Sequence, residues 1–130
     1  MAKKHTPGFL KVVEAAKARI SEVSAEDVLA RHATGDTSWV LVDVREESEW
    51  AAGHASFAVH MGKGIIERDS EKTWTDLNTE LVLYCGGGFR SALAADALQT
   101  MGYTRVTSLA GGWRAWKAAG GPTSSSTVPA

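Results

Sequence analysis

The chain has 130 residues, of which 44% are hydrophobic, and a formal net charge of -1. This length fits one domain that buries its own core without disulfides or metals as staples. The nearly balanced charge, without a basic or acidic block, argues against nucleic acid or an anionic membrane as a partner. No apolar run is long enough to cross a bilayer, so no membrane association is expected.

The N-terminal region predicts a loose tail followed by an amphipathic helix. Pro7 suits the first turn of a helix, and apolar residues recur at helical spacing from Phe9 to Ile20. Charged residues interrupt this stretch, so it lacks the apolar region of a secretory signal, and we expect a cytoplasmic protein. We predict a tail and helix over 1–20, the main domain over 21–120, and a disordered Gly/Ser/Thr-rich tail over 121–130.

Between these ends, predicted strands alternate with predicted helices. The strands are short apolar runs at 39–44, 58–61, 80–84 and 105–109. The helices are expected at 25–32, where Ser24 and Asp27 resemble a capping box, and at 46–52, 91–101 and 113–119. Residues 62–70 predict one helical turn. The alternation indicates an α/β fold with a parallel sheet and helices on both faces.

Cys85, the one cysteine of the sequence, is the candidate nucleophile. It follows a predicted buried strand, at the edge of a parallel sheet where ligands bind, and precedes Gly86, Gly87 and Gly88. Glycines permit a tight loop whose N–H groups form an anion-binding nest. A helix start and the fixed charge of Arg90 add positive potential, which favours the thiolate over the thiol. One loop thus supplies a nucleophile and an oxyanion cradle.

Four segments of the chain, in order, resemble signatures of the rhodanese family of sulfurtransferases. The first two segments are Leu41-Val42-Asp43-Val44-Arg45 and Glu49-Trp50 with Gly53-His54. The third, which resembles the family's active-site loop, is Tyr84-Cys85-Gly86-Gly87-Gly88-Phe89-Arg90-Ser91. The last is Gly102-Tyr103 with Leu109-Ala110-Gly111-Gly112-Trp113 and Trp116. The match extends from about residue 21 to 120. It implies a rhodanese-like fold with a central parallel sheet of about five strands.

The resemblance also implies a two-step sulfur transfer. Cys85 attacks a small anionic donor such as thiosulfate, becomes a persulfide, and passes the sulfur to cyanide or a thiol, which can belong to a protein. Gly86, Gly87, Gly88, Phe89, Arg90 and Ser91 would bind the persulfide and the donor's oxygens. Neither a metal nor an organic cofactor is expected.

Several side chains outside this loop are interpreted as supporting rather than catalytic. Asp43 and Arg45 follow a strand and are expected to connect its end to neighbouring loops, with Glu49 placed to pair with Arg45 one helical turn away. His54 is expected to make a structural hydrogen bond. Phe89 can form an apolar wall or a docking point for an acceptor protein.

Three alternatives for the chemistry stay open from the sequence. The leading one is an enzyme of the thiosulfate sulfurtransferase type, and the second is a carrier that relays sulfur between proteins through the same cysteine. The third is a cysteine-dependent phosphatase or arsenate reductase of related fold. Four residues separate Cys85 from Arg90, whereas the related phosphatases have five, so loop length favours sulfur over phosphate.

Overall fold

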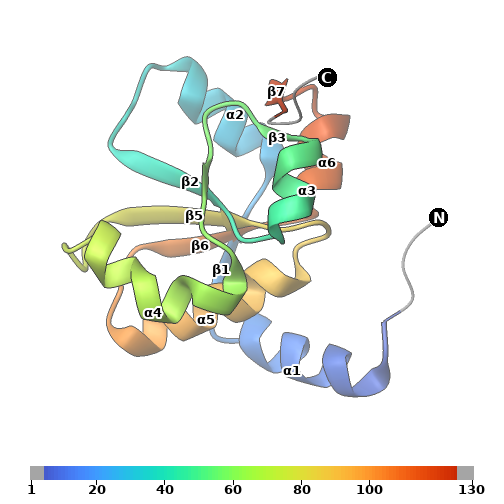
Figure 1. The fold of residues 1–130 in the computed structure, drawn as a ribbon, viewed down its shortest axis with the longest axis vertical. Coiled ribbons are helices and arrows are strands. Elements are labelled where there is room, and N and C mark those ends of the chain that lie inside the picture. The colour runs from blue at the N-terminus through green and yellow to red at the C-terminus, as the bar shows by residue number, and fades with distance from the viewer. Residues whose placement is uncertain (1–4, 126–130) are drawn as a thin grey trace.

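A five-stranded parallel sheet lies between two layers of helices in the computed structural model, which describes residues 5–125 (Figure 1). The sheet has the order β1-β6-β5-β2-β4, and β3 and β7 form a separate antiparallel pair. The strands are β1 (Ser21–Val23), β2 (Trp39–Asp43), β3 (His54–Ala55), β4 (Val59–His60), β5 (Glu80–Tyr84), β6 (Val106–Leu109) and β7 (Thr123–Ser124). The helices are α1 (Pro7–Lys17), α2 (Ala25–Ala33), α3 (Glu47–Ala52), α4 (Lys63–Thr73), α5 (Phe89–Met101) and α6 (Gly112–Ala118).

The central strands are apolar on both faces because each face has its own core. Along β5, Leu81 and Leu83 pack in the core formed with α4 and α5, while Val82 and Tyr84 pack in the core formed with α2 and α6. Figure 1 shows these helix layers on opposite sides of the sheet, with α1 packed against α5. Burial on both faces explains the nearly continuous apolar runs of β2 and β5.

Side-chain and glycine caps define several helix ends, as the sequence predicts. The Ser24 hydroxyl accepts a hydrogen bond of 3.0 Å from the Asp27 N–H and begins α2. The Thr6 hydroxyl caps α1, whose first residue is Pro7. Gly102 ends α5 in the left-handed region, with φ of 112°. These caps fix where each helix meets the sheet.

Three features of the fold differ from the sequence prediction. The edge strand β1 was not expected, because its three residues carry little apolar pattern and pair only with β6. Helix α4 runs over eleven residues instead of one turn, with Ile66 and Ser70 buried. The disorder predicted for 121–130 is wrong over 121–125, because β7 pairs with β3 there; 126–130 lie outside the described residues.

Candidate functional site

The Cys85 loop connects the end of β5 to the start of α5, at the carboxyl edge of the sheet. Strand β5 lies between β2 and β6, so the loop stands at the centre of that edge. Gly88 caps α5 with φ of 95°, a conformation that a side chain would strain. A Cβ added there would lie 3.2 Å from the Gly111 nitrogen, so glycine also permits the close approach of the next loop.

The Cys85 sulfur lies inside the curve of this loop. The Gly88 N–H donates to Sγ across 3.1 Å, and the Ser91 hydroxyl lies 3.5 Å from Sγ. A 2.8 Å hydrogen bond between the Ser91 and Ser108 hydroxyls links Ser91 to β6. Donors directed at sulfur stabilise its negative form. The loop therefore places a backbone N–H and a hydroxyl group against the sulfur.

Other backbone donors of the loop are available for a ligand. Within residues 5–125, the N–H groups of Gly87, Phe89 and Arg90 donate to no protein acceptor. Phe89 and Arg90 belong to the first turn of α5, whose N–H groups have no partner inside the helix. These donors form the kind of nest that binds oxyanions.

The first turn of α6 holds the loop from the other side. The Trp113 N–H donates to the Cys85 carbonyl at 2.6 Å, and the Arg114 N–H donates to the Gly86 carbonyl at 3.3 Å. Gly112, with φ of 53°, lets α6 come this close, because a Cβ there would lie 2.3 Å from the Cys85 oxygen. The Gly111-Gly112 pair is thus part of the architecture of the site.

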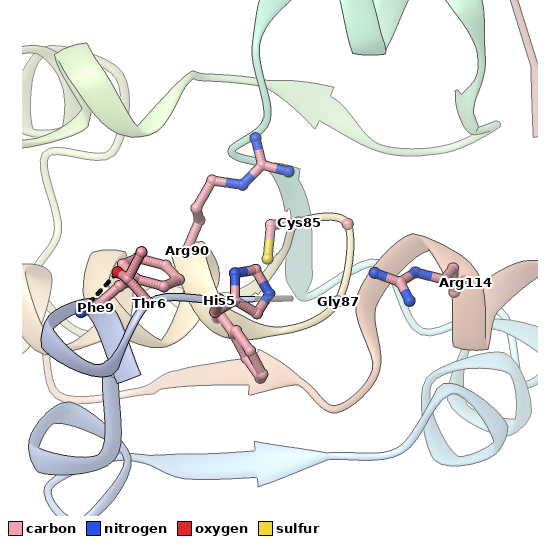
Figure 2. A pocket seen from close by; sticks show the side chains of 9 residues that line it. His5, Thr6, Phe9, Cys85, Gly87, Arg90 and Arg114 are labelled. Atoms are coloured by element: carbon pink, nitrogen blue, oxygen red, sulfur yellow. Dashed lines mark hydrogen bonds between the residues drawn. The ribbon is translucent and has the colours of Figure 1, made fainter. Parts of the chain in front are cut away.

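A cavity of about 410 Å³ opens above the cysteine. Figure 2 shows the Cys85 side chain between those of Arg90 and Arg114, with the N-terminal segment nearby. Among residues 5–125, nine line the cavity, none of them a carboxylic acid: His5, Thr6, Phe9, Cys85, Gly86, Gly87, Phe89, Arg90 and Arg114. Cys85 itself is only 1% exposed, so access to its sulfur is through this cavity.

Arg90 forms a forked ion pair with Glu49 of α3. Its two terminal nitrogens donate to the two Glu49 carboxylate oxygens at 2.8 and 3.1 Å. This hydrogen bonding raises the pKa of Arg90 and lowers the pKa of Glu49. The pairing of Glu49 with Arg45 predicted from the sequence is wrong, because α3 turns this carboxylate toward the Cys85 loop instead.

Asp43 and Arg45 form a buried pair at the end of β2, outside the cavity. The Arg45 guanidinium donates to Asp43 at 2.8 Å and to the Gly53 carbonyl at 2.6 Å, and its backbone N–H also donates to Asp43. Both residues are at least 96% buried. These contacts join the end of β2 to the segment between α3 and β3, and the supporting role of the pair stays a prediction. The His54 ring likewise contacts the Trp50 carbonyl at 2.7 Å.

Two parts of the cavity wall were not identified from the sequence. The N-terminal segment reaches the loop through Phe89, whose ring centroid lies 4.6 Å from that of His5 and 6.3 Å from that of Phe9. Arg114 comes from α6 and is not among the residues predicted for the site. No local pattern identifies either, because both reach the site by packing of distant segments.

Of the predicted loop residues, Cys85, Gly86, Gly87, Phe89 and Arg90 line the cavity. Gly88 and Ser91 contact the sulfur instead.

In the described part of the chain, no cluster of three or more His, Cys, Asp or Glu residues could hold a metal ion. Nor does any helix there have the length and hydropathy needed to cross a membrane.

Comparison with known proteins identifies the family. The sequence model of the rhodanese-like domain matches residues 24–119, well over half of the chain. The chain belongs to the rhodanese family. Its fold is rhodanese-like, as the sequence predicts, and the matched range includes the Cys85 loop and the Gly111-Gly112 pair but leaves out α1. Helix α1, which contributes Phe9 to the cavity wall, lies outside the matched range.

Named relatives within this family point to sulfur transfer. The chain is 33% identical to thiosulfate sulfurtransferase GlpE of Coxiella burnetii, covering 61% of this chain and 72% of that protein. It is 30% identical to "Putative sulfur carrier protein YrkF" of Bacillus subtilis, covering 75% of this chain and 51% of the relative. These relatives support a transferase of the rhodanese family.

A solved structure resembles almost the whole chain. It is a Rhodopseudomonas palustris protein of unknown function, RPA3614, titled a possible tyrosine phosphatase. The TM-score is 0.82 at 30% identity, over 95% of this chain and 99% of that one. The similarity therefore includes regions outside the range of the family model.

Proposed function

We propose that this protein is a sulfurtransferase that moves sulfane sulfur from a thiosulfate-like donor to a thiophilic acceptor through a Cys85 persulfide. The observation that carries the proposal is the position of the Cys85 sulfur. It receives the Gly88 N–H at 3.1 Å and lies at the base of a cavity bordered by two arginines. A nucleophile and donors for oxyanions are thus present in one loop.

The reaction has two steps. The Cys85 thiolate attacks the outer sulfur of thiosulfate, the bond between the two sulfurs of the donor breaks, and sulfite leaves with the bonding electron pair. Cys85 now carries a persulfide, which the unpaired N–H groups of Gly87, Phe89 and Arg90 can stabilise. An acceptor such as cyanide attacks the terminal sulfur, leaves as thiocyanate, and regenerates the thiolate. No external oxidant or reductant is consumed.

The cavity lining favours sulfur transfer over phosphatase chemistry. A cysteine-dependent phosphatase needs an acid that protonates the leaving oxygen. None of the nine lining residues is a carboxylic acid, and Glu49 is held by Arg90. Sulfite needs no such proton to leave. The phosphatase alternative predicts hydrolysis of p-nitrophenyl phosphate, and our proposal predicts none above the Cys85→Ser background.

Steady-state kinetics with thiosulfate and cyanide tests the proposal. We expect thiocyanate formation with a ping-pong pattern, in which double-reciprocal plots at different cyanide concentrations are parallel. The Cys85→Ser variant should form none. Intersecting plots, or thiocyanate formation that survives the substitution, would contradict a persulfide on Cys85.

A protein-fed sulfur carrier is the second candidate, supported by the similarity to the YrkF protein. A carrier would use the same cysteine but turn thiosulfate and cyanide over poorly. Incubation with a purified protein that bears a persulfide distinguishes the two. Loading of Cys85 from that protein, with negligible loading from thiosulfate, would favour the carrier.

The proposal extends to the physiological acceptor of the sulfur and to the compartment of the protein. We propose a thiol acceptor, small or on a protein, in the cytoplasm. The reduced state of a cytoplasmic cysteine suits a thiolate nucleophile. Neither a nucleic acid nor a membrane is part of this proposal.

A further inference from the structure

The two arginines beside Cys85 differ in how their charges are compensated. Glu49 binds both terminal nitrogens of Arg90, and the two side chains are about one third exposed, at 34% and 36%. An opposite charge in contact cancels much of the field that a cation exerts on a more distant anion. The ion pair therefore leaves Arg90 with little net attraction for a substrate.

Arg114 has no such compensation. Within residues 5–125, no carboxylate lies within ion-pair distance of its guanidinium. The side chain extends toward Gly87 of the Cys85 loop, as Figure 2 shows, and its Nη2 atom would lie 3.3 Å from a Cβ added at Gly87. The cavity above the sulfur thus has an uncompensated cation on this wall.

The backbone fixes the base of this side chain relative to the nucleophile. The Arg114 N–H donates to the Gly86 carbonyl, and the N–H of the preceding residue donates to the carbonyl of Cys85. The cysteine loop and the first turn of α6 consequently form one hydrogen-bonded unit. The Arg114 side chain is exposed, and its guanidinium has forked donors that match the oxygens of a sulfonate group.

We propose that Arg114 binds the anionic oxygens of the sulfur donor, while Arg90, held by Glu49, positions the Cys85 loop. This inference rests on the proposed function, because it takes the ligand to be an anionic sulfur donor such as thiosulfate. Once the outer sulfur has moved to Cys85, the same guanidinium holds the sulfite that leaves. A Cβ at position 87 would lie 3.3 Å from Nη2, so a side chain there would press on the guanidinium.

Donor kinetics gives the first test, with Lys117 as the matched control. Lys117 lies on the same helix and carries the same charge, but its Nζ lies 5.2 Å from the centre of the Trp113 ring and does not line the cavity. Arg114→Gln should raise the KM for thiosulfate about tenfold, and Lys117→Gln should change it less than about twofold. Arg114→Lys should recover part of the loss, because the charge remains and the fork does not.

Alkylation of Cys85 gives a second test that does not depend on sulfur transfer. Iodoacetate and iodoacetamide have the same leaving group and differ in charge, so the ratio of their rates reports the potential at the sulfur. Arg114→Gln should lower this ratio about fivefold, the factor for two unit charges about 4 Å apart in water. Glu49→Gln should raise it by removing the charge that compensates Arg90. Lys117→Gln should leave it unchanged.

The outcomes separate this inference from the proposed function. An unchanged KM and an unchanged alkylation ratio in Arg114→Gln would overturn the assignment. Equal effects of Arg114→Gln and Lys117→Gln would also overturn it, because they would indicate a general field. If the wild-type protein takes no sulfur from thiosulfate but the alkylation ratio falls in Arg114→Gln alone, the proposed function fails and the anion site remains. Thermal unfolding of each variant identifies any loss of fold.

Discussion

Substitution of Gly112 by alanine should disrupt the site without altering any residue that contacts the substrate. The new Cβ would lie 2.3 Å from the Cys85 carbonyl oxygen, whereas ordinary contact begins near 3.4 Å. The loop and α6 must therefore separate by about 1 Å, the difference between these two distances. The hydrogen bond from Trp113 to the same carbonyl would lengthen or break.

The expected cost has two parts. Alanine at φ of 53° costs about 1–2 kcal/mol for its left-handed backbone. A buried carbonyl without its partner costs about 1–3 kcal/mol more. Gly112→Ala should therefore lower the free energy of unfolding by about 2–5 kcal/mol. A nucleophile displaced by about 1 Å should react about a hundredfold more slowly.

Gly35→Ala is the matched control. Gly35 has φ of 80°, so alanine there has the same backbone penalty, but its Cβ would meet nothing within 4 Å. The difference in the free energy of unfolding between the two variants, measured in denaturant, isolates the cost of the steric contact. The rate of sulfur uptake from thiosulfate reports the displacement of Cys85. If Gly112→Ala is no less stable than Gly35→Ala and takes up sulfur at the wild-type rate, the proposed coupling of loop and helix is refuted.

Three further substitutions test other parts of the structure. The pKa of Glu49 is lowered in the folded protein, chiefly by hydrogen bonding to Arg90. The ionised carboxylate therefore stabilises the fold above the unfolded carboxyl pKa of about 4.3, and this stabilisation is lost as pH falls through the lower pKa of the folded protein. Acid unfolding of Glu49→Gln should accordingly depend less on pH below about pH 4 than that of the wild type, and equal slopes would contradict the pairing. The Tyr84 hydroxyl accepts from the Ala55 N–H at 3.0 Å, so Tyr84→Phe should cost about 1–3 kcal/mol in denaturant unfolding, and no cost would show the bond to be dispensable. Phe89→Ala removes the ring that His5 and Phe9 contact, so amide hydrogen exchange in the first turns of α1 should speed up while β5 stays protected. Unchanged exchange in α1 would contradict the idea that Phe89 anchors this segment.

The sequence predicts the central fold well because the information is local. Strands β2 and β5 are recognisable as short apolar runs, since both of their faces are covered. The Cys85 loop is recognisable because three glycines and a helix start follow a strand. Ser24 and Gly102 mark helix ends through the hydrogen bonding and backbone conformations of their own residue types.

Features that depend on tertiary packing could not be predicted in this way. Glu49 lies 41 positions before Arg90, and only the placement of α3 decides that it pairs there and not with Arg45. The contact of α1 with the loop depends on its packing against α5. Arg19, two residues after the end of α1, pairs with Asp96 of α5 at 2.7 Å. Strand β7 forms because a partner strand is nearby, although its own residues indicate disorder.

Mass measurement of the intact protein detects sulfur bound to Cys85 directly. The purified protein is incubated with thiosulfate under non-reducing conditions and weighed beside the Cys85→Ser variant. We expect a gain of one sulfur atom in the native protein alone, and its removal by cyanide. No gain in the native protein, or an equal gain in both proteins, would contradict a persulfide on Cys85.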